Sequence, residues 1–178
     1  MKKTTLVVVS VLVLLAGAAT AGTKEFWKGG IYVTPQFGIN SWGGSIPFGV
    51  NVEYGLTENI GIGGSAMFNF WSDEWWSETL INLAAEAAYH FTKIPTDKLD
   101  LYAGAGLGYS IYSWKYKSGY SGWDDSGSGS SGLYLQLIAG VRYFVSPKIA
   151  VSLRAIGSLI GHWAGVGGAL GATFILGK

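Results

Sequence analysis

The sequence predicts an all-β fold, an eight-stranded antiparallel up-and-down transmembrane β-barrel. The chain contains 28 glycines, 8 tryptophans, 10 tyrosines and 8 phenylalanines, and so much glycine disfavours a helical protein. After the first 21 residues no apolar run reaches the roughly 18 residues that a membrane-spanning helix needs. Instead, apolar residues alternate with small or polar ones over segments of about 9–11 residues, which is the length of a membrane-spanning strand.

The first 21 residues have the features of a cleaved secretory signal peptide. Lys2 and Lys3 precede an apolar run from Leu6 to Leu15, and Ala19-Thr20-Ala21 supplies a small-x-small cleavage site. The apolar run is short for an uncleaved anchor helix, which is the alternative. Cleavage would leave residues 22–178 as a single outer-membrane β-barrel domain.

Charge and cysteine content exclude several classes of protein. The leader holds two of the 12 basic residues and none of the 11 acidic ones, so its loss changes the formal charge from +1 to −1. Such a chain has no basic field to attract nucleic acid. The sequence has no cysteine, which excludes a lipid anchor on cysteine, a disulfide scaffold and cysteine-based metal or redox chemistry.

Eight segments follow the alternating pattern in chain order. In the second, Phe48, Val50 and Val52 alternate with Gly49 and Asn51, so the two faces of the strand carry opposite chemistry. The first and last segments are weaker but in phase. The expected strands cover about 29–40, 46–54, 60–70, 81–90, 99–110, 133–143, 149–159 and 165–176.

All charged residues within these segments fall on the face opposite to the apolar one. That face is otherwise mostly glycine, serine, alanine and asparagine, which suits a narrow lumen. A soluble lipocalin-like barrel, the less favoured alternative, would have the reverse arrangement, with an apolar interior. The inward residues are Glu53, Glu86, Asp100, Arg142 and Arg154, together with His90.

Four of these charges predict an internal ion-pair network that closes the lumen. Glu53 and Arg142 lie about two residues from their turns, on strands that face each other across an eight-stranded barrel. Glu86 and Arg154 match in depth in the same way, about five residues from their turns. An unpaired charge in so confined a space would be costly. Asn51 and Gln136 complete the expected polar network, whereas His90 is interpreted as a polar lumen residue near a turn rather than a metal ligand.

The connections predict which end of the barrel faces which side. Three are short and polar: "VEYGLTENIGI", "AYHFTKIPTDKLDLY" and "VRYFVSPKIAV". They are expected to be periplasmic turns, with both termini periplasmic. The other connections, at about 40–45, 72–78, 117–131 and 161–165, hold or adjoin seven of the 8 tryptophans. The expected aromatic girdles consist of Tyr54, Tyr89 and Tyr143 at the inner interface and Trp42, Trp71, Trp114 and Trp163 at the outer one.

The stretch "NIGIGGSA" spells Gly61-x-Gly63-x-x-Ala66, a variant of the dinucleotide-binding fingerprint. That fingerprint requires a following helix, whose N-terminus receives the pyrophosphate. Here the alternation simply continues through "MFNFW". Gly61 and Gly63 are therefore predicted to point into the lumen and to make room beside Glu53 and Arg142.

At this point the chain resembles the outer-membrane β-barrel domain family, the small opacity-like and porin-like barrels of Gram-negative bacteria. The resemblance covers residues 22–178 and rests on "VEYGLTENIGIGGSAMF", "LYAGAGLGY" and "LIAGVRYFVSPKIAVSLRA". It implies residence in the outer membrane, contact with membrane lipid and lipopolysaccharide, and insertion by the barrel-assembly machinery; it implies no cofactor. The chain departs from the family in ending on Gly177-Lys178 rather than on an aromatic residue.

Three functions remain open at this stage. The first is a non-enzymatic envelope-structural or surface-interaction role with a largely closed polar lumen, with extracellular ligands bound through loops 72–78 and 117–131. The second is a narrow pore or conduit for small apolar molecules, with Met67, Ile138, Ile156 and Ile160 as its constriction. The third, a lipid-A-modifying acyl hydrolase using Ser158 and His162, is disfavoured because its His-x-Ser arrangement is absent.

The acidic pairs Asp73-Glu74 and Asp124-Asp125 could attract a divalent cation. Paired acids in loops are usually solvated, so no metal site is expected.

Overall fold

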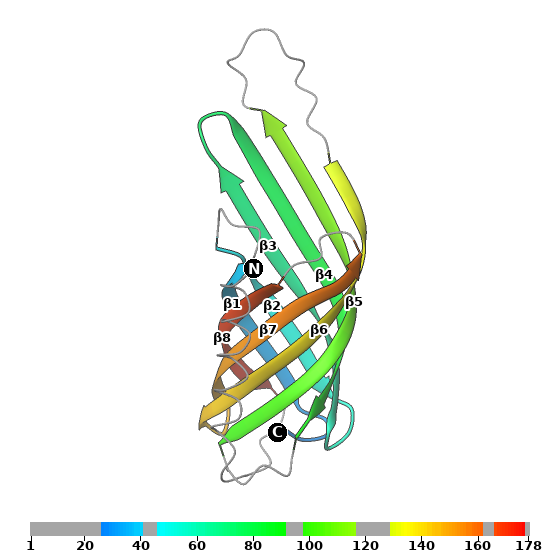
Figure 1. Ribbon diagram of the computed structural model, residues 1–178. Helices are drawn as coiled ribbons and strands as arrows, with labels where there is room; N and C mark the ends of the chain where they lie inside the picture. Colours follow the sequence, from blue (N-terminus) through cyan, green and yellow to red (C-terminus); the bar gives the residue numbers. More distant parts are fainter. Residues whose placement is uncertain (1–25, 41–45, 92–97, 117–128, 162–165, 177–178) are drawn as a thin grey trace, which may run out of the picture.

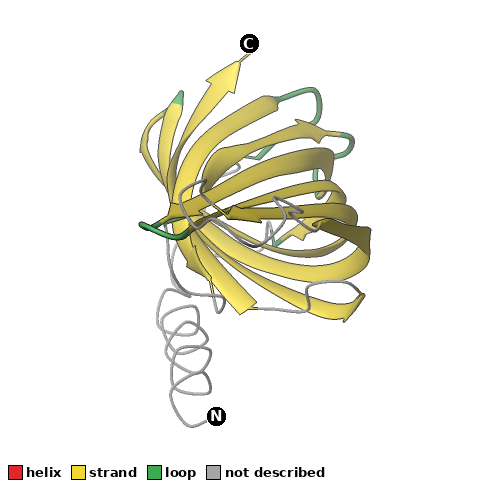
Figure 2. Cartoon of the chain, turned by 90° about the horizontal axis from the view of Figure 1, so that it is seen from above, coloured by secondary structure: helices red, strands yellow, loops and turns green. Residues whose placement is uncertain are grey.

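A computed structural model describes residues 26–40, 46–91, 98–116, 129–161 and 166–176. Eight strands form a closed barrel in which each pairs antiparallel with its neighbours in the chain and β8 pairs with β1 (Figures 1 and 2). The predicted fold class is therefore confirmed. The strands are β1 (Ile31–Asn40), β2 (Phe48–Gly55), β3 (Ile60–Ser72), β4 (Trp76–His90), β5 (Leu99–Tyr116), β6 (Gly129–Ser146), β7 (Ile149–Gly161) and β8 (Val166–Leu176).

The leader segment 1–21 lies outside the described residues, as do Trp42, Asp124, Asp125, His162 and Trp163. No helix among the described residues is long and apolar enough to cross a bilayer.

The outer face of the barrel is apolar, whereas the inner face carries the charged, polar and small side chains together with large ones such as Tyr102 and Phe144. Leu107, Leu133 and Leu137 are each about half exposed, whereas Ser110 and Thr173 on the inner face are completely buried. This arrangement is the reverse of a soluble barrel, and it confirms the assignment of the two strand faces.

The barrel has a short-turn end and a tall end. At the short-turn end lie the tight connections 56–59 and 147–148, and Ile31 pairs with Leu176. At the tall end, β3 to β6 rise well beyond the other strands (Figure 1). At a rise of about 3.3 Å per residue and a tilt of about 40°, the 18 residues of β5 climb about 45 Å along the axis and the 8 residues of β2 about 20 Å.

The extra height comes from strand continuing where a loop was predicted. The expected connection 72–78 is reduced to a turn at 73–75, because β4 already begins at Trp76. In the same way β5 continues to Tyr116 and β6 begins at Gly129. The parts of β3 to β6 above the last pair with β2 form the projecting sheet, made of residues 69–72, 76–80, 112–116 and 129–130.

Glycines opposite tyrosines let large rings lie flat within the narrow lumen. Gly140 pairs with Tyr102 across β5 and β6, and Gly108 pairs with Tyr134 in the same strand pair. A Cβ atom on either glycine would overlap the ring of its partner. The side chain missing on one strand is thus replaced by the ring from the next.

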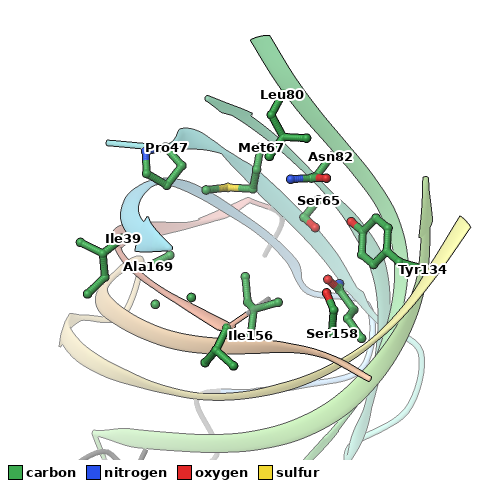
Figure 3. A pocket seen from close by; sticks show the side chains of 14 residues that line it. Ile39, Pro47, Ser65, Met67, Leu80, Asn82, Tyr134, Ile156, Ser158 and Ala169 are labelled. Atoms are coloured by element: carbon green, nitrogen blue, oxygen red, sulfur yellow. The ribbon is translucent and has the colours of Figure 1, made fainter. Parts of the chain in front are cut away.

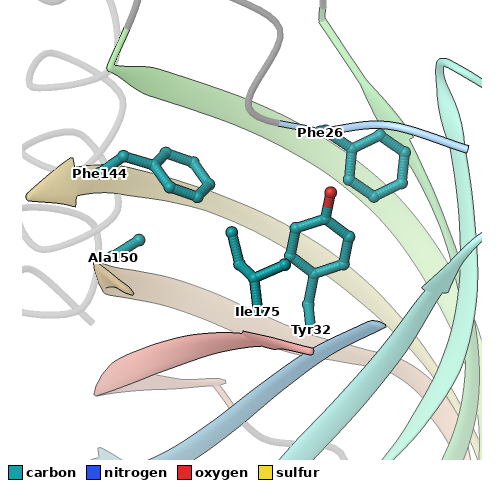
Figure 4. Packing of buried hydrophobic residues seen from close by; sticks show 5 residues of the cluster. All are labelled: Phe26, Tyr32, Phe144, Ala150 and Ile175. Carbon is teal, nitrogen blue, oxygen red and sulfur yellow. The ribbon is translucent and has the colours of Figure 1, made fainter. Parts of the chain in front are cut away.

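A strap of residues 26–30 covers the short-turn end. Gly29 adopts a φ of 86°, which other residues rarely tolerate, and its N–H donates to the carbonyl of Gly55 at 2.7 Å. The Gly55 N–H donates in turn to the carbonyl of Gly30 at 2.9 Å. Through this turn the strap places the ring of Phe26 inside the barrel, where it packs with Tyr32, Phe144, Ala150 and Ile175 (Figure 4).

A β-bulge near the top of β7 changes one predicted orientation. Gln136 pairs with Ser158, but the next pair along β6 is Leu135 with Ile160, so Leu159 is the extra residue. Beyond the bulge Ile160 has the outward parity and is 70% exposed. Its expected place in an apolar constriction of the lumen is therefore wrong.

Candidate functional site: two charged clusters in the lumen

Four strands contribute one charged side chain each to a cluster near the short-turn end. Glu53 comes from β2, His90 from β4, Asp100 from β5 and Arg142 from β6. Each lies on the inner face close to the end of its strand, and Asp100 and Arg142 are cross-strand partners. All four are buried. We call this set the lower cluster.

The lower cluster is a closed ring of contacts. His90 Nε2 lies 2.9 Å from Glu53 Oε1, and His90 Nδ1 lies 2.7 Å from Asp100 Oδ1. Arg142 donates to Asp100 Oδ2 at 3.2 Å and to Glu53 Oε2. Carboxylate oxygens only accept, so both ring nitrogens of His90 are satisfied when the ring carries two protons. The cluster then contains two cations and two anions, which leaves no net charge in the lumen.

Aromatic rings enclose the lower cluster. The Phe26 ring stacks on the His90 ring with centroids 3.5 Å apart and planes at 4°. The guanidinium of Arg142 lies over the rings of Tyr102 and Tyr32, at 4.7 Å and 5.1 Å from their centroids. Ring faces attract cations, particularly where water is excluded. The strap and these rings therefore seal the cluster from the short-turn end.

A second set of polar side chains, the upper cluster, surrounds Glu86 of β4. Glu86 Oε1 accepts hydrogen bonds from Ser65 Oγ at 2.6 Å and Gln136 Nε2 at 2.8 Å, and Asn51 Nδ2 donates to Oε2 at 3.0 Å. Arg154 NH2 lies 2.6 Å from Oε1. That nitrogen makes no hydrogen bond, so the contact with Glu86 is an ion pair only.

Little space remains between the two clusters. A cavity of about 10 Å³ lies between Glu53, Glu86 and Arg154, which is room for about one water molecule. A larger cavity of about 100 Å³ lies above the upper cluster, toward the tall end (Figure 3). Its lining is mixed, with Met67, Leu80 and Ile156 beside polar Asn82 and Ser158.

The structure brings the six residues of the expected polar network together in two groups rather than one. Glu53 contacts Arg142 in the lower cluster, and Glu86 contacts Arg154, Asn51 and Gln136 in the upper one. Sequence reasoning placed His90 and Asp100 in the lumen but gave them no part in the network. Their inward parity was the available signal, and the missing information was the register between strands.

The expected girdle residues separate into two sets. Tyr54, Tyr89 and Tyr143 lie on the outer face near the short-turn end and are about half exposed. Trp71 and Trp114 have the inward parity, since both are cross-strand partners of Glu78. They therefore face the inside of the projecting sheet, and the expectation that they belong to a membrane-facing girdle is corrected.

Neither cluster has the arrangement of a hydrolase. Ser158 lines the cavity toward the tall end, whereas His90 lies near the other end with both nitrogens directed at carboxylates. Among the described residues no group of three or more histidine, cysteine, aspartate or glutamate side chains is placed to hold a metal ion. What the arrangement does is fill the lumen with paired charges.

Comparison with known proteins agrees with this architecture. The family model described as outer membrane protein beta-barrel domain matches residues 9–174. The chain belongs to this family. The resemblance seen in the sequence is thereby confirmed, and the protein is an outer-membrane β-barrel. A comparison with curated proteins gave no match.

Solved structures of the same fold come from several bacteria. The N-terminal β-barrel domain of OprF from Pseudomonas aeruginosa is 17% identical with a TM-score of 0.60, over 84% of this chain and 98% of that one. Ail, the attachment invasion locus protein of Yersinia pestis, is 15% identical with a TM-score of 0.58, over 84% and 99%. OprG from Pseudomonas aeruginosa is 8% identical with a TM-score of 0.61, over 88% and 100%. At these identities the likeness concerns the fold alone.

Proposed function

We propose that this protein is a non-enzymatic outer-membrane barrel with a closed lumen, acting in envelope integrity or surface contact rather than in bulk transport. Its termini and short turns face the periplasm, and the projecting sheet faces the exterior. Insertion by the barrel-assembly machinery and contact with lipopolysaccharide belong to the same proposal.

The filled lumen is the observation that carries the proposal. The apolar cluster around Phe26, the lower cluster and the upper cluster lie one above another, and the cavity between the two charged clusters is about 10 Å³. A solute crossing the barrel would have to separate buried ion pairs, which costs several kcal/mol for each charge left unpaired. A barrel of eight strands has little interior space beyond what its side chains occupy.

Single-channel recording tests the closed lumen. We expect the purified protein to give no steady, large conductance in planar bilayers, because the paired charges hold the lumen shut. A large porin inserted into the same membranes supplies the positive control. Steady, large openings from the folded protein alone would contradict the proposal.

The cavity of about 100 Å³ supports a second candidate, a conduit for small molecules. Met67 and Ile156 line it as expected for an apolar passage, but Ile138 packs below it with Ala88 and Tyr102. Below this cavity the side chains of the upper cluster fill the lumen, so a conduit would have to pass around them. Swelling of liposomes in small uncharged solutes distinguishes the two candidates, since only a conduit raises the swelling rate.

The non-enzymatic part of the proposal has its own test. Lipid A extracted from cells that overexpress the protein should have an unchanged mass. Loss of an acyl chain would show a lipid-modifying hydrolase instead.

A further inference from the structure

On β4 and β5 the two faces of the projecting sheet reverse their chemistry, whereas on β3 the outward Phe70 is still apolar. Lower in the barrel the outward face is apolar, but above it the outward face of β4 and β5 carries Ser77, Thr79, Ser113 and Lys115. The inward face becomes aromatic at the same height. A polar outer face is expected above the apolar band, which is about 25 Å tall in outer-membrane barrels. An aromatic inner face has no such explanation and points to a binding surface. The inward aromatic residues are Trp71, Trp76, Tyr112, Trp114 and Tyr116.

Among the residues that the structure describes, a single carboxylate lies in the middle of this aromatic face. Glu78 of β4 pairs with Trp71 of β3 on one side and with Trp114 of β5 on the other. Directly opposed residues on one face have Cβ atoms about 4.5–5.5 Å apart. The hydroxyl of Tyr112 donates to Glu78 Oε1 at 3.0 Å. The acid is therefore held among indole and phenol rings.

The rings around Glu78 are held in place by their neighbours. Trp71 and Trp76 meet edge to face with centroids 5.0 Å apart, and Trp114 and Tyr116 do so at 4.8 Å. Asp73 accepts from Trp76 Nε1 at 2.6 Å and from the Trp76 backbone N–H at 3.0 Å, which orders the turn above. A ligand that binds here needs to order few side chains, and this favours binding.

The net negative charge of this region favours a positively charged ligand. The described residues of the projecting sheet and the turn 73–75 include three acids, Asp73, Glu74 and Glu78, against one base, Lys115. Lys115 has the outward parity, on the opposite face from Glu78. Aromatic faces and a carboxylate together recognise an organic cation, because both attract positive charge and the rings also bury its methyl or methylene groups.

We propose that the inner face of the projecting sheet binds small organic ammonium cations, with the charged nitrogen at Glu78 between Trp71 and Trp114. The same face continues down through Leu80 and Asn82 into the cavity of about 100 Å³, which offers room for an apolar substituent (Figure 3). The proposal rests on the projecting sheet facing the exterior, as the proposed function has it. A neutral sugar is the competing ligand, but the paired rings meet edge to face and do not form one flat stacking platform.

Calorimetric titration with choline tests the site in the purified, folded barrel. The protein is kept in nonionic polyoxyethylene micelles, because phosphocholine detergents present the same ammonium group and would compete. We expect choline to bind, and 3,3-dimethylbutan-1-ol, its uncharged isostere, to bind at least about tenfold more weakly, since it lacks the charge that ring and carboxylate attract. Folding of each variant is checked by its heat-modifiable shift on gels.

Variants assign the site to named residues. Glu78→Gln should weaken choline binding by about tenfold or more, whereas Glu74→Gln, which removes a charge from the turn of the same hairpin, should leave it within about twofold. Trp114→Phe keeps an aromatic face and should retain binding that Trp114→Leu loses.

Four results would overturn the cation site. These are equal affinity for the alcohol and choline, equal affinity of Glu78→Gln and the parent, binding of maltose but not choline, and no binding of choline at all. None of them depends on conductance, so failure of the closed lumen and failure of this site are separate outcomes.

Discussion

Arg142 is the largest of the fully buried side chains in the described part of the barrel. It is 1% exposed, two carboxylates contact its guanidinium group, and two tyrosine rings lie over it. A buried ion cluster of this kind contributes little net stability compared with an apolar filling of the same shape. Removing one member is different, because the remaining charges are then left unpaired in a dry space.

Replacing Arg142 should therefore destabilise the barrel strongly. We expect Arg142→Met to lower the free energy of unfolding by about 3–5 kcal/mol, because Glu53 and Asp100 lose their shared cation. Urea unfolding in lipid vesicles, followed by tryptophan fluorescence, measures the change. Lys148→Met, which removes the same charge from an exposed turn, should shift the free energy by less than about 0.5 kcal/mol. A loss below 1 kcal/mol for Arg142→Met would show that the cluster is not the closed ring described above.

At the scale of the strand, β3 shows why its glycines are needed. Gly61 lies on the inner face opposite Gly55, and a Cβ atom there would overlap the carboxylate of Glu53. A Cβ atom on Gly63 would overlap the backbone of Val52 and Glu53. Gly61 and Gly63 of "NIGIGGSA" thus leave room for the side chain of Glu53 in the lower cluster. They are part of a strand and not of a nucleotide-binding loop.

A bulky residue at position 61 should hinder closure of the barrel. We expect Gly61→Phe to reduce the fraction of protein that folds into vesicles, measured by the heat-modifiable gel shift, because the ring competes with Glu53 for the same space. Gly157→Phe is the matched control, since a Cβ atom at Gly157 meets nothing within 4 Å. If Gly61→Phe folded as completely as the control, the assignment of this face to the lumen would be wrong.

The whole molecule is asymmetric along its axis. β5 climbs more than twice as far as β2, and the closed, charged part of the lumen lies at the short-turn end. An even number of strands leaves both ends of the barrel sequence on the same side, where Ile31 pairs with Leu176. The extra height at the other end belongs outside the membrane, since it exceeds the apolar band of about 25 Å.

Labelling of introduced cysteines tests this orientation. The native chain has no cysteine, so Glu74→Cys in the turn of the projecting sheet and Glu58→Cys at the short-turn end each supply a single thiol. In intact cells a membrane-impermeant maleimide should label Glu74→Cys only, and permeabilised cells should show both. Labelling of Glu58→Cys alone in intact cells would reverse the orientation.

The sequence by itself determined the number of strands, the face on which most side chains of the regular strands lie and the presence of charge in the lumen. These properties follow from a period of two residues, which is local and can be seen in any one strand. Glu53, Glu86, Arg142 and Arg154 could therefore be assigned to the interior without knowledge of the neighbouring strands. The outward parity of Tyr54, Tyr89 and Tyr143 followed in the same way.

Only the tertiary structure decided which inward residues meet, because register and barrel closure join strands that are far apart in the chain. His90 contacts both Glu53 and Asp100, although the three residues come from three different strands. Phe26 enters the barrel through a turn at Gly29, which the alternating pattern does not predict. The bulge at Leu159, which shifts the register between β6 and β7, turned Ile160 outward. The height of β3 to β6 was missed because polarity no longer marks the inner face of the projecting sheet. Trp71 and Trp114 continue the parity of the lumen, but their side chains are aromatic.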